Sequence, residues 1–393
     1  KSLQKEVTLH LVAFSSENYW KDEDQKHYAG LMLAEIGAKI ETAGVKYDKI
    51  IITGDEDIGK LGESGFSGTE PALFFPMSGA TQAMMLKSAL FFDVLGICIT
   101  YSDFFINRNL ANKMLVKNAA PATMDIYAVL KRQKKHLSLV TDLNNALKLY
   151  HAKLALDRMK NATLLRIGET EPWVISATKD LNLIKAKLGV KVVSIPQTTL
   201  EEEYKKITGD EVAERAEEWI SPVRKLHGID KNDVVKALRV SKAVETLADR
   251  YKADAVSIAC FNLLGLIGTT ACLAVSELNE SECMIGGCEG DVDIALTLML
   301  MKALTSKPGW VANPILEHND LLRLAHCTAP RYKNKYRYDL MKHHESGIGV
   351  SPKIIMPNLE KITLARLGNE LSALNIFTGV TLDSHSVETC RTQ

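Results

Sequence analysis

The stretch GGCEGDVD, residues 286–293, runs directly into the apolar residues 294–304 and is the most informative stretch for predicting the fold. Acidic residues are favoured at a helix N-terminus, because free backbone N–H groups and the helix dipole stabilise negative charge. The pattern therefore predicts that Asp291 or Asp293 caps a buried helix. Capping does not explain Glu289, which lies in the tight glycine-rich loop before that helix. A glycine-flanked carboxylate at this place is suited to bind a cation or to move a proton.

Buried runs alternate with helical patterns on the N-terminal side of this stretch. The expected strands cover residues 162–167, 173–176, 190–195 and 253–260, and the expected helices cover 179–188, 200–219, 231–251 and 263–276. Strands that alternate with helices indicate a parallel sheet covered on both faces. We therefore expect an α/β domain with a parallel sheet over residues 161–307, and Glu289 belongs to it.

The first part of the chain shows the same alternation. The expected strands are 7–14, 49–53, 71–76 and 94–101, with helices at 28–43 and 80–92 and a long helical connection over 107–160. This predicts another parallel-sheet α/β domain over residues 1–160. Ligands of such sheets meet the loops at the carboxyl ends of the strands, here residues 15–18 and 77–82. The second loop would offer backbone N–H groups to a polar ligand, although ordinary turn chemistry explains it equally well.

From residue 308 onward the pattern changes to short alternating stretches separated by turns. They cover residues 310–312, 321–325, 348–355, 362–368 and 373–380. Such stretches are typical of antiparallel strands. The fold class that we expect is therefore α/β, with two parallel-sheet α/β domains followed by a smaller β-rich domain over residues 308–393.

Composition narrows the classes of function. The chain of 393 residues carries 48 basic and 48 acidic residues, so nothing indicates a nucleic-acid partner, which requires clustered Lys and Arg. No apolar run reaches the length of a membrane span, and no nucleotide-binding glycine motif is present. The seven scattered cysteines favour a reducing, cytoplasmic setting with buried thiols. Because the first residue is Lys1, we expect the natural start to lie further upstream.

The order of motifs in the last third of the chain adds a family resemblance. After 286–304 come PGWVANP at 308–314, LAHCTAP at 324–330 and HHESGIGV at 343–350. This order resembles the C-terminal half of the L-fucose isomerase and L-arabinose isomerase superfamily. Those proteins are metal-dependent aldose–ketose isomerases that usually use manganese. The resemblance covers about residues 286–350, agrees only loosely with the layout of the first 280 residues, and implies a barrel-like C-terminal domain.

The resemblance implies roles for single residues. It assigns Glu289 both as a metal ligand and as a proton-transfer group, and it places Asn262 toward the sugar. Asn313 occupies the position of the family's second acidic ligand, which is a departure. An amide oxygen still binds a cation, but an amide cannot act as a base near neutral pH. Another group would have to take over, and Asp291 is our candidate for this catalytic role, with Asp293, His326 and Glu345 as further candidates nearby.

Three further residues complete the expected site. His326 lies where arabinose isomerases carry a metal-binding His, and the alternative is a core His that is hydrogen-bonded to a backbone carbonyl. His343 and Glu345 would share one face of a strand and contact substrate, whereas a hairpin with solvated polar residues is the alternative. The family also uses a His near its C-terminus, and no matching segment occurs up to Gln393.

These observations predict an intramolecular oxidoreductase, a sugar isomerase acting on an open-chain sugar or sugar derivative. Moving a proton between neighbouring carbons through an enediol needs acid/base groups, and a cation stabilises the developing charge. The resemblance implies a divalent metal, Mn²⁺, and a homo-oligomer, a trimer or hexamer. Two alternatives stay open: carbon–carbon cleavage or transfer on the same scaffold, and a non-catalytic sugar-binding or regulatory protein.

Overall fold

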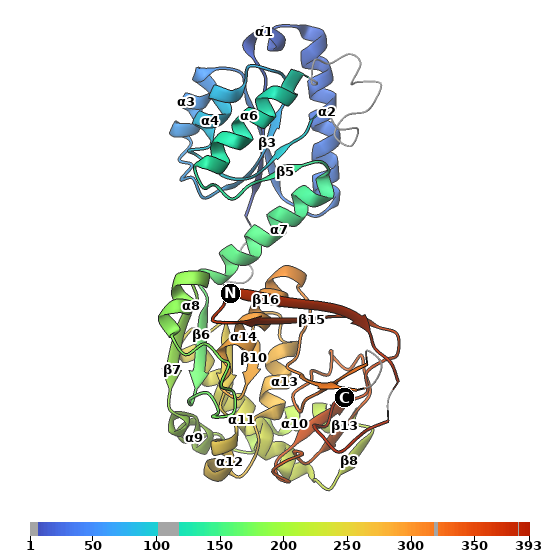
Figure 1. The fold of residues 1–393 in the computed structure, drawn as a ribbon. Coiled ribbons are helices and arrows are strands. Elements are labelled where there is room, and N and C mark those ends of the chain that lie inside the picture. Colours follow the sequence, from blue (N-terminus) through green and yellow to red (C-terminus); the bar gives the residue numbers. More distant parts are fainter. Residues whose placement is uncertain (1–6, 101–117, 318–320, 384) are drawn as a thin grey trace. The chain divides into compact units, whose positions relative to one another are not determined.

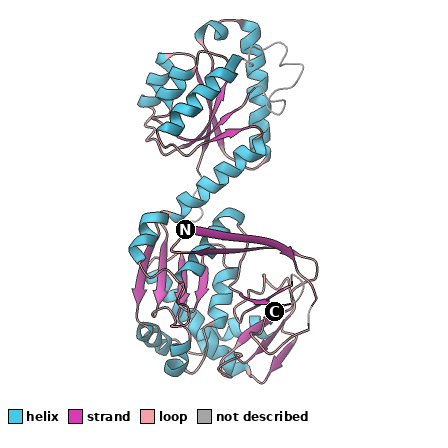
Figure 2. Cartoon of the chain, in the orientation of Figure 1, coloured by secondary structure: helices cyan, strands magenta, loops and turns pink. Residues whose placement is uncertain are grey.

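The computed structural model describes residues 7–100, 118–317, 321–383 and 385–393. The chain divides into two compact units, an N-terminal unit of residues 5–154 and a C-terminal unit of residues 155–393 (Figure 1). The chain is a mixed α/β protein with two parallel sheets and smaller antiparallel sheets toward its C-terminus (Figure 2). The fold class expected from the sequence is thereby confirmed at this general level. The count of three domains stays a prediction.

The N-terminal unit is built on one five-stranded parallel sheet in the order β2-β1-β3-β4-β5. Its strands are β1 (Leu9–Phe14), β2 (Tyr47–Ile52), β3 (Pro71–Pro76), β4 (Asp93–Cys98) and β5 (Ser138–Val140). Its helices are α1 (Glu17–Trp20), α2 (Glu23–Thr42), α3 (Asp55–Glu63), α4 (Gln82–Ser88), α6 (Ala119–Arg132) and α7 (Leu143–Met159). β1 and β3 are buried along their whole length, as expected of strands covered on both faces.

Two apolar layers cover this sheet. One joins β1 and β3 to α2 and α7, and the other joins the opposite face to α3, α4 and α6. The strand β5 lies within the segment that we expected to be entirely helical, and its three residues pair with β4. The part of that predicted connection over 107–117 lies outside the described residues.

The C-terminal unit contains a four-stranded parallel sheet in the order β10-β9-β6-β7. Its strands are β6 (Thr163–Ile167), β7 (Lys191–Ile195), β9 (Ala255–Ile258) and β10 (Ile285–Cys288). Around it lie α8 (Leu181–Leu188), α9 (Gln197–Lys206), η3 (Asp210–Val212), α10 (Ala213–Ile220), α11 (Lys231–Arg250), α12 (Phe261–Ile267), α13 (Cys272–Glu280) and α14 (Val292–Thr305). One face packs on α9, α11 and α13, and the other packs on α8 and α14.

Three predicted elements between residues 161 and 307 differ in the structure. The helix expected over 200–219 is divided into α9, η3 and α10. Residues 173–176 are not a strand, because the segment after Pro172 turns and packs its Trp173 ring against Phe261. The helix expected over 263–276 is two helices, since Gly268 adopts a left-handed conformation (φ 66°) and ends α12. In the described part of the chain, no single helix has both the length and the apolar character needed to cross a membrane; α12 and α13 pass together but are bent by 116°.

The C-terminal strands join the same compact unit and form small sheets. They are β11 (Asn313–Leu316), β12 (Leu322–Ala325), β13 (Tyr338–Met341), β14 (Ser351–Ile354), β15 (Lys361–Gly368) and β16 (Ala373–Val380). β8 (Lys225–His227) pairs with β13, so one small sheet takes strands from both sides of residue 307. Tyr338 and Leu340 of β13 enter the same apolar cluster as α11. Residues on both sides of the predicted boundary at 307/308 belong to one compact unit, and that boundary stays a prediction.

Candidate functional site at the carboxyl ends of the parallel strands

Glu289 lies at the turn between β10 and α14. Both Glu289 (φ 59°) and Gly290 (φ 63°) adopt left-handed backbone conformations, which reverse the chain between strand and helix. A Cβ at Gly290 would come within 2.9 Å of the carbonyl oxygen of Glu169, so the glycine allows this close approach. For Glu289 the same conformation costs about 1–3 kcal/mol, and residues held in this way cluster at functional sites. The prediction that Glu289 sits in a tight loop at a helix start is confirmed.

The loop that follows β6 is fastened to this turn. The N–H of Glu171 donates to the carbonyl of Glu289 (2.9 Å), and the hydroxyl of Thr170 donates to the carbonyl of Gly290 (2.8 Å). The side chain of Trp173 lowers the pKa of the Glu289 carboxyl group. The loops after β6 and β10 therefore hold each other at the same edge of the sheet.

Acidic side chains gather around Glu289. Burial, the largest influence, raises the pKa of Glu289 above its ordinary value, whereas the hydrogen bond from Trp173 opposes this rise. The charges of Asp291, Glu171 and Glu345 raise the pKa of Glu289 further. Two effects that both disfavour the ionised carboxylate are thus combined at one position.

Glu171 is a second perturbed carboxyl group at this edge. It is 4% exposed, and burial raises its pKa although its carboxylate accepts a hydrogen bond from the N–H of Phe261 (3.0 Å). A small pocket opens beside it, lined by Thr170, Glu171, Pro172, Val174, Ile175, Ala177 and Lys179. Glu171 was not among the residues predicted from the sequence. The available signal was an acid four residues beyond a buried strand, at the edge where ligands of parallel sheets bind.

Asp291 is the N-cap of α14. Its Oδ1 accepts hydrogen bonds from the N–H groups of Asp293 (2.9 Å) and Ile294 (3.1 Å), and its Oδ2 pairs with the guanidinium of Arg366 at 2.8 Å. Both carboxylate oxygens are therefore engaged in holding the helix start and the strand β15. This confirms the capping interpretation. The catalytic role assigned to Asp291 stays a prediction.

Phe261 brings two predicted substrate-binding segments together. Its ring meets Trp173 edge-on at 4.8 Å and His343 edge-on at 5.8 Å. Asn262 follows it as an exposed residue of α12. His343 and Glu345 lie in the turn between β13 and β14 rather than on a strand, and the Nδ1 of His343 hydrogen-bonds with the hydroxyl of Ser346 at 3.1 Å.

The two other predicted metal ligands are placed differently. Asn313 is an exposed residue of β11, opposite Ala325 of β12. His326 is 5% exposed, its Nδ1 hydrogen-bonds with the Thr328 hydroxyl (2.8 Å), and its backbone pairs with Thr392. Burial lowers the pKa of His326 to about 4, so its ring is neutral at neutral pH.

A metal ion is not accommodated by the predicted donors as they stand. Glu289 has acidic groups as its charged neighbours, Asn313 faces solvent, and one ring nitrogen of His326 is already engaged. Across residues 7–100, 118–317, 321–383 and 385–393, no three His, Cys, Asp or Glu side chains are arranged to hold a metal ion. The manganese site at Glu289, Asn313 and His326 stays a prediction.

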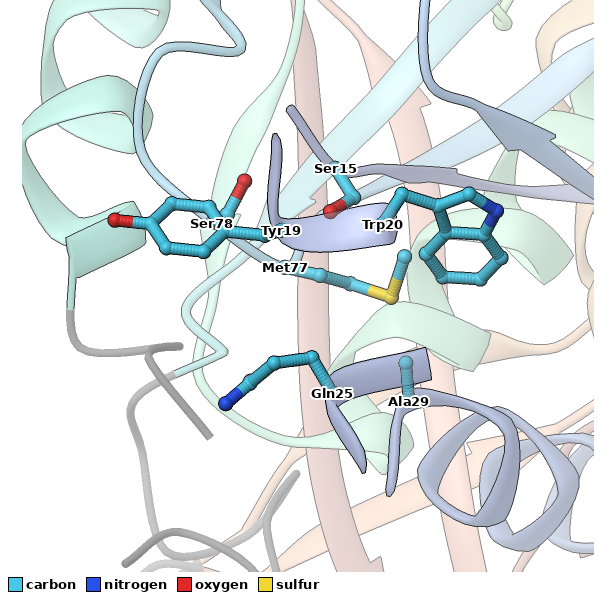
Figure 3. A pocket seen from close by; sticks show the side chains of 7 residues that line it. All are labelled: Ser15, Tyr19, Trp20, Gln25, Ala29, Met77 and Ser78. Atoms are coloured by element: carbon cyan, nitrogen blue, oxygen red, sulfur yellow. The ribbon is translucent and has the colours of Figure 1, made fainter. Parts of the chain in front are cut away.

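The N-terminal unit carries its own pocket where β1 and β3 end. The pocket is lined by Ser15, Tyr19, Trp20, Gln25, Ala29, Met77 and Ser78 (Figure 3). The N–H of Ser16 donates to the Ser78 hydroxyl (2.8 Å), which joins the two loops. Tyr19 and Trp20 extend to opposite sides of α1. The two loops were predicted from the sequence. The aromatic residues Tyr19 and Trp20, which directly follow the first loop in the chain, were not.

The fold and these two sites define a doubly wound α/β protein in which acidic side chains gather at the carboxyl ends of the second sheet. Comparison with known proteins gives no closer assignment, because no family model matches the chain and no curated protein sequence matches it.

Proposed function

We propose that the C-terminal unit is a sugar isomerase-like enzyme that interconverts an open-chain aldose, or a related sugar derivative, with the corresponding ketose. The observation that supports this proposal is the pair Glu289 and Glu171. They are two carboxyl groups with raised pKa on neighbouring loops at the carboxyl ends of β10 and β6. A carboxyl group whose pKa lies closer to neutrality is a better proton donor and acceptor for this reaction.

The two carboxyl groups carry out different proton transfers in an enediol mechanism. One, in its ionised form, removes the proton from the carbon beside the carbonyl while the other, in its protonated form, gives a proton to the carbonyl oxygen. The enediol that results then takes a proton back at the neighbouring carbon and loses one from the other oxygen. We assign the carbon-bound proton to Glu289 and the oxygen-bound proton to Glu171. Trp173 favours the ionised form of Glu289, because its side chain lowers the pKa of that carboxyl group.

We propose that the enzyme requires Mn²⁺, and this requirement is to be measured. When bound, a divalent cation would hold two sugar oxygens and stabilise the negative charge of the enediolate. The predicted donors do not form a binding set in this structure, so no step above depends on the metal. The proposal places the enzyme in the cytoplasm, which the use of cysteine supports, and as a homo-oligomer, a trimer or hexamer.

A second candidate function is a different carbohydrate reaction on the same scaffold, such as carbon–carbon cleavage or transfer. Asn313 favours it, because an amide occupies the position where the resemblance implies an acid and an amide does not accept protons near neutral pH. A non-catalytic sugar-binding or regulatory protein is the third possibility, and it predicts sugar binding without turnover.

The test compares three variants of the purified full chain against a panel of common aldoses and ketoses. Glu289→Gln and Glu171→Gln each remove one proton-transfer group with little change of shape. Glu169→Gln is the matched control, because Glu169 lies on the same loop with its side chain 83% exposed. We expect both site variants to lose isomerisation and the control to keep it. Isomerisation that survives in both site variants, or sugar binding with no turnover in the wild type, would contradict the proposal.

Metal content is measured in parallel. The protein is assayed as purified, after chelation, and after addition of Mn²⁺, Mg²⁺ or Zn²⁺. Activity that returns with Mn²⁺ supports the predicted requirement. Activity that is unaffected by chelation would refute the metal requirement. It would leave the proposed roles of the two carboxyl groups unchanged.

A further inference from the structure

Two cysteines meet directly beside Glu289. The Sγ atoms of Cys260 and Cys288 lie 3.5 Å apart, although the two residues are 28 positions apart in the chain. Cys288 is the last residue of β10 and pairs in register with Ile258, the last residue of β9. Cys260 follows β9 by two residues and is the N-cap of α12. Both thiols are free.

We propose that Cys260 and Cys288 form a reversible disulfide, a modification site that couples thiol oxidation to the shape of the candidate active site. A disulfide needs its sulfur atoms about 2.05 Å apart, so closing the present gap requires a movement of roughly 1.5 Å. The two residues differ in access. Cys260 is half-buried, whereas Cys288 is only 6% exposed. An oxidant would therefore reach Cys260 first, and Cys288 would complete the bond.

The exchange is balanced with a small organic disulfide as the oxidant. The sulfur of Cys260 attacks one sulfur of the reagent, a mixed disulfide forms, and the first reagent thiol leaves with the proton. The sulfur of Cys288 then attacks the sulfur of Cys260, and the second reagent thiol leaves with the second proton. Two protein thiols are oxidised and one reagent disulfide is reduced to two thiols.

The structure indicates which side would move. Cys288 is held in a buried strand, between β9 and α14, whereas Cys260 begins a short helix. Displacing Cys260 also displaces Phe261, whose N–H donates to the carboxylate of Glu171 and whose ring packs against Trp173. The disulfide would thus disturb the contacts of Glu171 while leaving the backbone of β10 in place.

The experiment incubates the reduced full chain with oxidised glutathione and maps the products. Trypsin is unsuitable, because no Lys or Arg lies between Lys252 and Lys302 and all four cysteines of that region stay in one peptide. Chymotrypsin cuts after Phe261 and within the following leucines, so it separates Cys260 from Cys272. We expect a Cys260–Cys288 peptide that is lighter by two hydrogens, loss of two of the seven free thiols, and recovery of both on reduction.

Variants and a second signal make the result decisive. Cys260→Ser and Cys288→Ala should each abolish the link, whereas Cys283→Ser, at another half-buried cysteine, should keep it. The tryptophan fluorescence, to which Trp173 contributes with three other tryptophans, should change on oxidation of the wild type and not of Cys260→Ser. A stable glutathione adduct on Cys260 with Cys288 still reduced would overturn the proposal. So would oxidation that links only other cysteines. Neither readout depends on enzymatic activity, so the disulfide can fail while the proposed isomerase stands, and the reverse.

Discussion

The two parallel sheets of this protein have the same strand order but different chemistry at their carboxyl ends. In each, the first strand lies in the middle, the second on one side, and the third and fourth on the other: β2-β1-β3-β4 in the N-terminal unit and β7-β6-β9-β10 in the C-terminal unit. Such sheets bind ligands where the strand order reverses. The N-terminal pocket at this point has uncharged lining, whereas the C-terminal edge gathers carboxylates. Topology thus decides where a site lies, and side chains decide what it does.

The residue directly after the first strand shows how the two sites diverge. In the N-terminal unit it is Ser15, whose side chain lines the pocket. In the C-terminal unit it is Gly168 (φ 82°), where a Cβ would lie 2.7 Å from the side chain of Gln197 and 2.9 Å from that of Ala259. The C-terminal loops therefore pack closely at this point. The functional groups of the C-terminal unit come from Glu171, further along the loop after β6, and from the turn after β10.

The largest expected effect tests the chemical difference between the two sheet edges. Glu289→Gln should reduce isomerisation about 100- to 10,000-fold, because that is the typical contribution of a positioned proton-transfer group. Ser78→Ala, at the N-terminal pocket, should leave the turnover number within a few-fold. Steady-state kinetics of both proteins check this. An equal loss in both variants would mean that the two sites act together in the reaction.

A smaller effect concerns the charged pair that holds the C-terminal edge together. Arg366→Ala leaves Asp291, whose side chain is 9% exposed, without its ionic partner at Oδ2. We expect a loss of about 1–3 kcal/mol in the stability of the C-terminal unit, the usual result of leaving a buried polar group unpaired. Hydrogen exchange at the first turn of α14 measures it. The control is Glu169→Ala, which breaks the pair between Arg166 and the largely exposed Glu169 and should cost less than about 1 kcal/mol.

The corresponding change in the N-terminal unit is expected to be smaller. Ser78→Ala removes the hydroxyl that accepts the N–H of Ser16, so we predict a loss of about 1 kcal/mol in the stability of that unit. Hydrogen exchange of residues 9–14 and 71–76 measures this loss. Ser78→Thr keeps a hydroxyl and serves as the control. A loss as large as that of Arg366→Ala would show that the uncharged edge is held as tightly as the charged one.

Glu171→Gln tests the burial of the second carboxyl group through the pH dependence of the protein's stability. Because burial raises its pKa, the folded protein keeps a proton that the unfolded chain releases above its ordinary pKa of 4.5. Stability therefore falls as pH rises from 4.5 through the folded pKa and stays lower above it. Glu171→Gln lacks this loss, so it should unfold at a higher temperature than wild type at pH 7 and at a similar temperature below pH 4.5. Thermal unfolding across this pH range gives the answer, and a variant that is less stable at pH 7 would refute the sign.

Asn313→Asp should have the smallest effect on stability, within about 0.5 kcal/mol, because Asn313 is exposed. Its effect on function has a sign that separates the two candidate reactions. If the protein is a standard two-acid isomerase that lost one acid, the new carboxylate should raise isomerase activity and divalent-metal affinity. If the scaffold serves another carbohydrate reaction, the same change should lower the native activity. Isomerisation and metal binding are measured for both proteins side by side.

Much of the framework could be predicted from local pattern. The strands β1, β3, β6 and β9 could be predicted because strands covered on both faces are largely apolar. The helix start at Asp291 was recognised because capping is a local interaction within four residues. Missed elements such as β8 and β13 are short, and they are strands because they pair with each other across more than 100 residues.

The sequence by itself determined the alternation of strands and helices and the place of Glu289 in a glycine-flanked loop at a helix start. Each of these follows from residues that are close in the chain. Only the tertiary structure decided that the loop with Glu171 and Trp173 is hydrogen-bonded to the turn at Glu289. It also decided that the rings of Phe261 and His343 are in contact, and that the sulfur atoms of Cys260 and Cys288 lie close together. These contacts depend on strand order and on the packing of segments far apart in sequence, which no local periodicity encodes.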